Sequence, residues 1–458
     1  MGWFTILPPL VAIIFVVWRK EVILALFLAI FTSEILLVAT KGVTLPLFGF
    51  LNSLERIAAV FTDVGNTRIL MFSLMVGALL AFIRVSGGVT AMVEKLVHSG
   101  MAKGPVSVGL LTMLTGVVIF IESNLSVLTA GILSRGLFDK YGMSRARLAY
   151  IIDSTSAPIC ILILLNGWGA YILALLGGYE LESSPAEILW STVPLNFYAI
   201  VTLLIVLYTV LTKKVFGPMK HAEIKAQAEL TDYQHEYPPT KARYMVIPLL
   251  TMVLGMIAFM FWTGGGDLAK GSGSKSVLYA TALACLVAYT MMLMSRKFSH
   301  IELVETGFKG MGELLPLVTI VLFSLALGAS LKDLGTGVFI ANMVGDFLPL
   351  ILVVPVLFIA GAIISFTTGT SWGTFAILIP LGVPLIQTLG LPPALVLSAI
   401  LGGGVFGDHC SPISDTTAVS AIASGCDLLE HVKTQLPYAL LAGGITLVLY
   451  VIAGAIMI

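Results

Sequence analysis

The chain has 458 residues, of which 58% are hydrophobic and 11% charged, and its mean hydropathy is +1.02. Soluble proteins carry about 25% charged residues, so this composition excludes a soluble enzyme and a disordered protein. Basic and acidic residues number 25 each, which leaves no basic field for binding nucleic acid. The four cysteines lie far apart, so neither a metal motif nor a disulfide framework is expected. The chain is predicted to be a polytopic membrane protein.

Long apolar segments predict the membrane spans, because a spanning helix needs about 20 mostly apolar residues. The segment 4–18 lacks a basic N-terminal region and a small-residue cleavage site, so we expect a retained helix rather than a signal peptide. Plain spans are predicted at 4–18, 21–40, 68–83, 189–211, 244–262, 277–294, 315–331 and 436–458. Four further apolar stretches are interrupted by Gly, Pro, Ser, Thr and acidic residues, at 105–138, 147–177, 350–388 and 394–424.

Loop charges predict the orientation of the chain, since cytoplasmic loops are rich in Lys and Arg. The segments 135–147 and 212–243 are basic and are expected in the cytoplasm, whereas 177–188 carries only acidic charges and is expected outside. Both termini then lie on the extracytoplasmic side of the cell inner (plasma) membrane. Only six of the 25 basic residues fall outside under this assignment, namely Lys41, Arg56, Arg68, Lys270, Lys275 and Lys332.

The chain divides into a first repeat, 1–211, a cytoplasmic linker loop, 212–243, and a second repeat, 244–458. Each half has the same order of plain spans and interrupted stretches. If the first interrupted stretch of each half is a re-entrant hairpin, each half crosses five times and the second half is inverted. The predicted fold is an all-α polytopic membrane protein with two inverted-topology repeats, each with a re-entrant hairpin and a broken transmembrane helix. This pattern is typical of secondary transporters.

The first predicted helix break contains a run of polar residues, Asp153-Ser154-Thr155-Ser156, followed by Pro158. Proline cannot donate a backbone hydrogen bond and clashes with the preceding turn. Carbonyl groups freed by such a break need a partner in the membrane. Because hard cations prefer oxygen ligands, the carboxylate and hydroxyl groups here predict a cation site.

The second predicted interruption, 402–417, places two carboxylates, an imidazole and four hydroxyl groups at bilayer depth. A charge at the membrane centre costs at least about 2.5–3.5 kcal/mol, so a functional role is the default interpretation. Structural alternatives stay open: Asp408 or Asp415 could cap a helix N-terminus, and His409 could be a structural histidine. Cys410 is expected to be a packing residue.

Two hairpin tips complete the candidate site. Glu122, Ser123 and Asn124 interrupt the first hairpin, and Thr368, Gly369 and Thr370 interrupt the second. Ordinary turn chemistry is the alternative interpretation of such residues. The polar interruptions themselves contain acidic residues but no basic residue, which favours a cation or proton as the transported species. Na⁺ is the expected ion, with Asp153, Asp408 and Asp415 as hypothetical ligands, and no cofactor is expected.

The run GDHCSPISDTTAVSAIASGCDLLEHVKTQLPYAL at 407–440 resembles the signature region of the NhaC-type sodium/proton antiporter family, and LAYIIDSTSAPICIL at 148–162 resembles its first-half counterpart. The family belongs to the ion transporter superfamily. The resemblance implies a dimerising scaffold domain, a transport domain with two hairpins and two broken helices, and elevator-like movement. It points to Asp153, Ser154 and Thr155, and to Asp408, His409, Ser411, Ser414, Asp415 and Thr416 as binding residues.

Two transport functions compete at this stage. The leading hypothesis is Na⁺/H⁺ exchange, in which carboxylates bind either Na⁺ or protons. The alternative is Na⁺-coupled transport or exchange of a small organic solute, such as a carboxylate or an amino acid, with the hairpin tips binding the solute. A channel is disfavoured because a continuous pore needs no inverted site. An intramembrane enzyme is disfavoured because the side chains of adjacent residues, such as His409 and Cys410, point in different directions.

Overall fold

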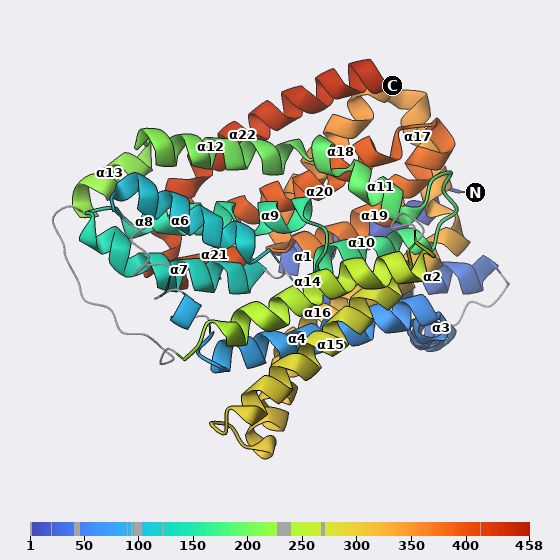
Figure 1. Ribbon diagram of the computed structural model, residues 1–458. Helices are drawn as coiled ribbons and strands as arrows, with labels where there is room; N and C mark the ends of the chain where they lie inside the picture. Colours follow the sequence, from blue (N-terminus) through green and yellow to red (C-terminus); the bar gives the residue numbers. More distant parts are fainter. Residues whose placement is uncertain are drawn as a thin grey trace.

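The computed structural model describes residues 2–19, 21–40, 46–88, 90–92, 95, 103–120, 123–226, 240–266, 271–412 and 414–458 (Figure 1). Throughout these ranges the regular structure is helical, with no strand. Ten of the helices described are long and apolar enough to cross a membrane, and a pair bent by 42° would make eleven. The chain is therefore an all-α, multi-pass membrane protein.

The first half of the chain contains twelve of the helices described, several of them short. They are α1 (Leu7–Arg19), α2 (Val22–Thr40), α3 (Pro46–Ala59), α4 (Val64–Val85), α6 (Pro105–Val118), α7 (Ser123–Lys140), α8 (Arg145–Ser154), α9 (Ala157–Leu162), α10 (Gly167–Gly177), α11 (Pro185–Ser191), α12 (Phe197–Thr212) and α13 (Pro218–Ala226). Short 3-10 turns cover Trp3–Ile6, Val60–Thr62 and Val193–Leu195.

The second half contains longer helices. They are α14 (Arg243–Thr263), α15 (Gly273–Met294), α16 (His300–Leu334), α17 (Thr336–Phe347), α18 (Leu350–Thr368), α19 (Ser371–Leu389), α20 (Pro393–Cys410), α21 (Asp415–Ser424) and α22 (Leu428–Met457). The 35 residues of α16 begin at a capping box, in which Ser299 and Glu302 each accept a hydrogen bond from the other's backbone N–H. The helix ends at Gly335, whose φ of 73° is accessible mainly to glycine.

Most of the predicted plain spans coincide with helices long enough to cross a membrane, whereas the apolar helix Trp3–Phe15 is shorter than the span predicted at 4–18. The span predicted at 189–211 lies within Pro185–Thr212, which is long and apolar enough to cross a membrane but is not one continuous α-helix. Helix α11 ends at Ser191, and α12 begins only at Phe197. Pro194 lies in the 3-10 turn between them. Proline in a helix interior would remove a backbone hydrogen bond, so the regular α-helix is interrupted here within the span.

The two hairpins lie at opposite ends of the molecule. Figure 1 shows α6 and α7 beside α8 and α13, at the end away from both chain termini, whereas α18 and α19 lie at the end that holds the termini. Helices α18 and α19 are each long and apolar enough to cross a membrane, so the re-entrant form of the second hairpin stays a prediction. The symmetry itself stays a prediction.

A group of long helices packs against one another beside the hairpins. Helices α4 and α16 approach so closely that a Cβ atom at Gly77 would overlap the carbonyl oxygen of Gly310. Helices α14 and α15 pack against each other and against α4. These four helices are called the scaffold below.

The predicted linker loop, 212–243, contains a docked helix. Met219 on α13 is fully buried. The Glu223 carboxylate accepts hydrogen bonds from the backbone N–H and the hydroxyl of Ser144, at 2.8 and 2.6 Å. The segment therefore packs against the start of α8, because a short amphipathic helix within a polar sequence buries its apolar face.

Candidate functional site

The first helix break lies where the sequence predicted it. Helix α8 ends at Ser154 and α9 begins at Ala157, with Pro158 in the first turn of α9. The Asp153 carbonyl, freed by the break, accepts a hydrogen bond from the Ser156 hydroxyl at 2.8 Å. The Thr155 hydroxyl bonds back to the carbonyl oxygen of Ile151, and both Ser154 and Thr155 are buried.

The Asp153 carboxylate is fully buried at this break. Its Oδ2 atom accepts a hydrogen bond from Gln435 Nε2 at 2.6 Å and lies 3.3 Å from His431 Nε2. Within the described part of the chain, its Oδ1 atom has no hydrogen-bond partner. Sequence reasoning missed Gln435 and His431. The available signal was a pair of polar residues four apart, which share one face of an apolar helix.

The second break is shorter than predicted. The interruption was expected over 402–417, but α20 continues as a helix to Cys410, and the break covers only Ser411–Ser414. The glycines at 403 and 407 serve close packing instead, since a Cβ atom at either position would overlap a carbonyl oxygen of α18. Glycine is tolerated within a membrane helix where a neighbouring backbone approaches this closely.

The two candidate carboxylates of the second break have different places. Asp408 lies in the last turn of α20, so the helix N-cap alternative is wrong for this residue. The cap of α21 is Ser414, whose hydroxyl accepts from the Thr417 N–H, and Asp415 is the first helical residue. The Asp415 and Thr368 side chains, and Glu122 as a whole, lie outside the part of the structure that is described.

The tip of the second hairpin docks on this break. The Ser371 hydroxyl, at the start of α19, donates to Asp408 Oδ2 at 3.0 Å. The Ser411 hydroxyl donates to the carbonyl oxygen of Phe366 at 2.8 Å. Ser414 and Thr416 hydroxyls lie 3.0 Å apart. Ser371 directly follows the predicted tip residues and was assigned no role from the sequence, but the structure shows that it contacts the carboxylate.

His409 joins the two breaks. Its Nε2 atom lies 3.2 Å from the carbonyl oxygen of Asp153, and its Nδ1 atom lies 3.2 Å from the Tyr198 hydroxyl. Gln435 makes a second link, because its Nε2 atom donates to the carbonyl oxygen of His409 at 2.9 Å as well as to Asp153. The breaks therefore meet in space although 256 residues separate Asp153 from His409. With both ring nitrogens in contact, His409 also fits the structural alternative.

The predicted residues of both hairpin tips line one cavity of about 330 Å³. Its wall also contains Trp168 and Trp372, whose ring centres are 5.5 Å apart, together with residues of α4 and α16. The predicted residues in this wall are Ser123, Asn124, Gly369 and Thr370. Beside the first tip, the carbonyl oxygen of Phe120 accepts from Asn166 Nδ2 at 3.0 Å, so this tip is fixed to the start of α10.

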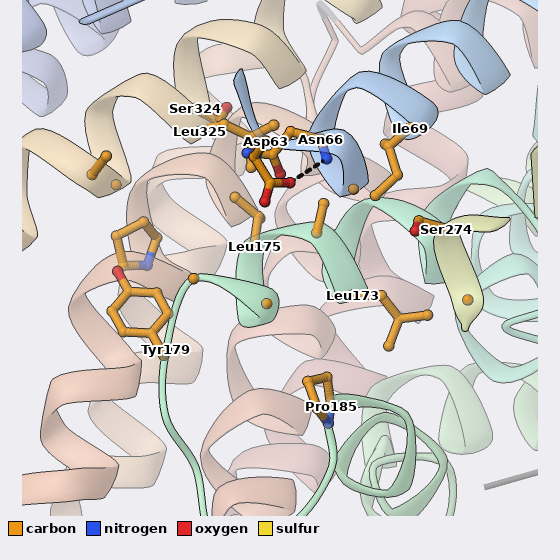
Figure 2. A pocket seen from close by; sticks show the side chains of 18 of the residues that line it. Asp63, Asn66, Ile69, Leu173, Leu175, Tyr179, Pro185, Ser274, Ser324 and Leu325 are labelled. Atoms are coloured by element: carbon orange, nitrogen blue, oxygen red, sulfur yellow. Dashed lines mark hydrogen bonds between the residues drawn. The ribbon is translucent and has the colours of Figure 1, made fainter. Parts of the chain in front are cut away.

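A larger cavity of about 720 Å³, which the sequence did not predict, lies between α4, α10, α15 and α16 (Figure 2). Figure 2 shows Asp63 accepting the backbone hydrogen bond of Asn66 on its wall. Ser324 lines this cavity, and the Tyr171 hydroxyl donates to Ser324 at 3.0 Å. Tyr171 stacks on Trp372 of the tip cavity, with ring centres 5.0 Å apart. Tyr171 thus contacts one lining residue of each cavity.

Comparison with known proteins adds the family. The sequence pattern of the Na⁺/H⁺ antiporter family matches residues 159–455. The chain belongs to the Na⁺/H⁺ antiporter family. It is therefore a secondary antiporter rather than an enzyme, and the resemblance to NhaC-type proteins is confirmed.

Individual relatives of this antiporter differ in what their names say they carry. An uncharacterized protein of Haemophilus influenzae is 30% identical and covers 98% of this chain, with 90% of its own length matched. The malate-2H⁺/Na⁺-lactate antiporter of Bacillus subtilis is 41% identical over 96 residues, 20% of each chain. The Na⁺/H⁺ antiporter NhaC of Alkalihalophilus pseudofirmus is 34% identical over 95 residues, again 20% of each chain.

A solved transporter structure shares the fold. The YdaH transporter of Alcanivorax borkumensis superimposes with a TM-score of 0.58 over 88% of both chains, at 12% sequence identity. At that identity the likeness concerns the helix arrangement alone.

Proposed function

We propose that this antiporter exchanges Na⁺ for H⁺ by letting the two ions compete for the carboxylates at its helix breaks, chiefly Asp153 and Asp408, with Asp415 as a third candidate. Water exclusion makes an ionised carboxylate costly unless a positive charge neutralises it. A proton or a Na⁺ ion can do so, but one carboxylate oxygen pair does not hold both. The occupancy of one ion therefore excludes the other, and this exclusion couples the two fluxes.

The environment of Asp153 carries this proposal. The side chain is fully buried at a helix break, and no Lys or Arg of the described ranges forms an ion pair with it. Oxygen atoms suited to a hard cation surround the break, including the hydroxyl groups of Ser154, Thr155 and Ser156. Within the described residues, no three His, Cys, Asp or Glu side chains converge on one point, so the proposed Na⁺ ligands are mixed carboxylate, hydroxyl and backbone oxygens.

Alternating access forms the second part of the proposal. The hairpins and broken helices would move together against the scaffold, in an elevator-like manner, and carry the ion site from one face to the other. The scaffold would also form the contact of a homodimer. The meeting of both breaks at His409 and Gln435 supports a single moving unit, because these contacts tie the two halves together.

A second candidate function rests on the cavity between the hairpin tips. Its volume of about 330 Å³ lies at the lower end of the range for small-molecule sites. The Ser123, Asn124 and Thr370 side chains could bind polar groups of a small organic solute, and Trp168 and Trp372 could cover its apolar part. The name of the Bacillus subtilis relative, a malate-lactate antiporter that uses Na⁺ and H⁺, favours this alternative.

The test uses purified protein in liposomes that contain a pH-sensitive dye. We expect a Na⁺ pulse to release protons when no organic solute is present. Asp153→Asn and Asp408→Asn should each lower this flux at least a hundredfold, because asparagine keeps the shape but can neither carry the charge nor take up a proton reversibly.

A matched control comes from the large cavity. Asp63 caps α4, and asparagine is an equally good cap, so Asp63→Asn should transport at the wild-type rate. Wild-type flux across pH 6–9 in the Asp408→Asn protein would contradict the exchange mechanism. Proton movement that begins only after malate or an amino acid is added would favour the organic-solute function instead.

A further inference from the structure

Gln435 occupies an unusual position for an uncharged residue, between the polar groups of both helix breaks. It lies on α22, is 1% exposed, and its Nε2 atom donates to Asp153 Oδ2 and to the carbonyl oxygen of His409. These two oxygens belong to different halves of the chain. The amide nitrogen thus fills the place between a carboxylate and a freed carbonyl, where a cation would be bound by the same two oxygens.

Three buried oxygen atoms at this amide and beside it have no hydrogen-bond partner within the described residues. They are Asp153 Oδ1, Ser154 Oγ and Gln435 Oε1, and all three residues are at most 1% exposed. A buried acceptor without a partner is costly, so it is rare unless another state of the protein uses it. Carboxylate, hydroxyl and amide oxygens are the ligands that hard cations prefer.

The space beside Gln435 favours an ion without its water shell. Gln435, Ser154 and His409 line a narrow cavity that leaves no room for a water molecule. A hydrated ion therefore does not fit there.

We propose that Gln435 is a cation ligand whose side-chain amide rotates when the ion binds, so that its oxygen rather than its nitrogen faces the site. This inference rests on the proposed function, in which Asp153 binds Na⁺. Without the ion, Nε2 stabilises the carboxylate of Asp153 by donating a hydrogen bond. When a dehydrated Na⁺ takes that place, Nε2 leaves and Oε1 turns toward the ion. The amide thereby exchanges a donor for an acceptor, so Asp153 Oδ2 has a partner in both states: an N–H group without the ion and Na⁺ with it.

Two substitutions separate the acceptor role from the donor role. Gln435→Glu keeps the length and an oxygen but loses the donor, and Gln435→Leu loses both. With Na⁺-driven proton flux measured in liposomes at pH 8.5, we expect Gln435→Leu to raise the apparent KM for Na⁺ at least tenfold. Gln435→Glu should keep this KM within about threefold of the wild type or lower it, because a carboxylate oxygen also coordinates Na⁺.

Ion selectivity distinguishes a ligand from a structural residue, because loss of a merely structural residue would not change the preference between Li⁺ and Na⁺. The ratio of the KM values for Li⁺ and Na⁺ should change in Gln435→Leu and stay constant in a control, Gln387→Leu. Gln387 is an exposed amide on α19 that donates to the carbonyl oxygen of Glu180, outside the proposed site. If Gln435→Leu does not fold, Gln435→Asn serves in its place, since its shorter amide should also raise the KM for Na⁺.

The outcomes are distinct. A Gln435→Glu protein with the same raised KM as Gln435→Leu would overturn the inference, because the donor would then be the group that matters. An unchanged KM in Gln435→Leu would overturn it too. Asp153→Asn, measured in the same assay, tests the proposed function separately. If that variant is inactive while Gln435→Leu matches the wild type, only the role of Gln435 is wrong.

Discussion

The two carboxylates of the helix breaks differ in their partners, and this difference assigns them different parts in the site. Asp153 faces an amide and an imidazole from α22, whereas Asp408 faces the Ser371 hydroxyl of a hairpin tip. A substitution at Asp153 therefore removes contacts with α22, and a substitution at Asp408 removes a contact with the tip of the second hairpin. One carboxylate links the breaks to each other, and the other links a break to its hairpin.

Glu34, an acidic residue within the helix α2, has a structural environment. Its Oε1 atom accepts from Arg56 Nε at 2.7 Å and from the Ser330 hydroxyl at 2.8 Å, and the residue is 4% exposed. We expect Glu34→Ala to lower the free energy of unfolding by about 1–3 kcal/mol, because Arg56 then loses its buried partner. The lower stability should appear as a reduced Tm in detergent.

Asp333 is the matched control for this prediction, since it contacts the same arginine from an exposed position. Its carboxylate lies 2.8 Å from Arg56 Nη1, and its side chain is 55% exposed. Exposed ion pairs contribute about 0–1 kcal/mol, so Asp333→Ala should change the Tm much less. Equal losses in the two variants would contradict a role for burial at Glu34.

At the scale of elements, the contact between α18 and α20 depends on glycine. A Cβ atom at Gly407 would overlap the carbonyl oxygen of Ala362 and lie 2.7 Å from the backbone nitrogen of Phe366. Backbone atoms do not move aside as a flexible side chain does. We expect Gly407→Ala to lower stability by about 1–3 kcal/mol, and also to lower transport, because α18 leads into the tip that contacts Asp408.

The control for this substitution lies on α22. A Cβ atom at Gly444 would meet no other atom within 4 Å, and alanine is a better helix former than glycine by about 1 kcal/mol. Gly444→Ala should therefore keep the wild-type Tm or raise it, and should transport normally. A stable, fully active Gly407→Ala protein would show that the two helices can separate without cost.

The sequence predicted the elements of the site better than their exact ends and partners. Proline and the polar run located the break at Asp153 because both act within a few residues. The second break was predicted too long, since the glycines at 402–407 look like helix breakers in sequence but serve helix packing in the structure. His431, Gln435 and Tyr198 were missed because their roles depend on contacts between segments that are far apart in sequence.

At the scale of the whole molecule, two cavities follow the same pair of scaffold helices. The large cavity includes Ile69 of α4 and Ser324 of α16, and the tip cavity begins one turn further along each helix, at Phe72 and Ile320. Tyr171 contacts one lining residue of each cavity, through its bond to Ser324 and its stacking on Trp372. A single aromatic side chain therefore connects the walls of the two cavities in this structure.

The charges around α13 predict the orientation of the molecule in the membrane. Figure 1 shows both termini at one end and α13 at the other. The segment around α13 carries Lys213, Lys214, Lys220 and Lys225, and positive charge is retained in the cytoplasm. Both termini should then be extracytoplasmic, as expected if two halves of five crossings each return the chain to its starting side.

Cysteine labelling of whole cells tests this orientation. Trp3, Ile224 and Ile456 are 72%, 61% and 78% exposed, so a cysteine at each position can react in a protein whose four natural cysteines have been replaced. An impermeant maleimide should label Trp3→Cys and Ile456→Cys on intact cells, and Ile224→Cys only after permeabilisation. The reverse pattern would invert the whole assignment. Labelling of positions 3 and 456 from opposite sides would contradict an even number of crossings, and with it the five-crossing repeats.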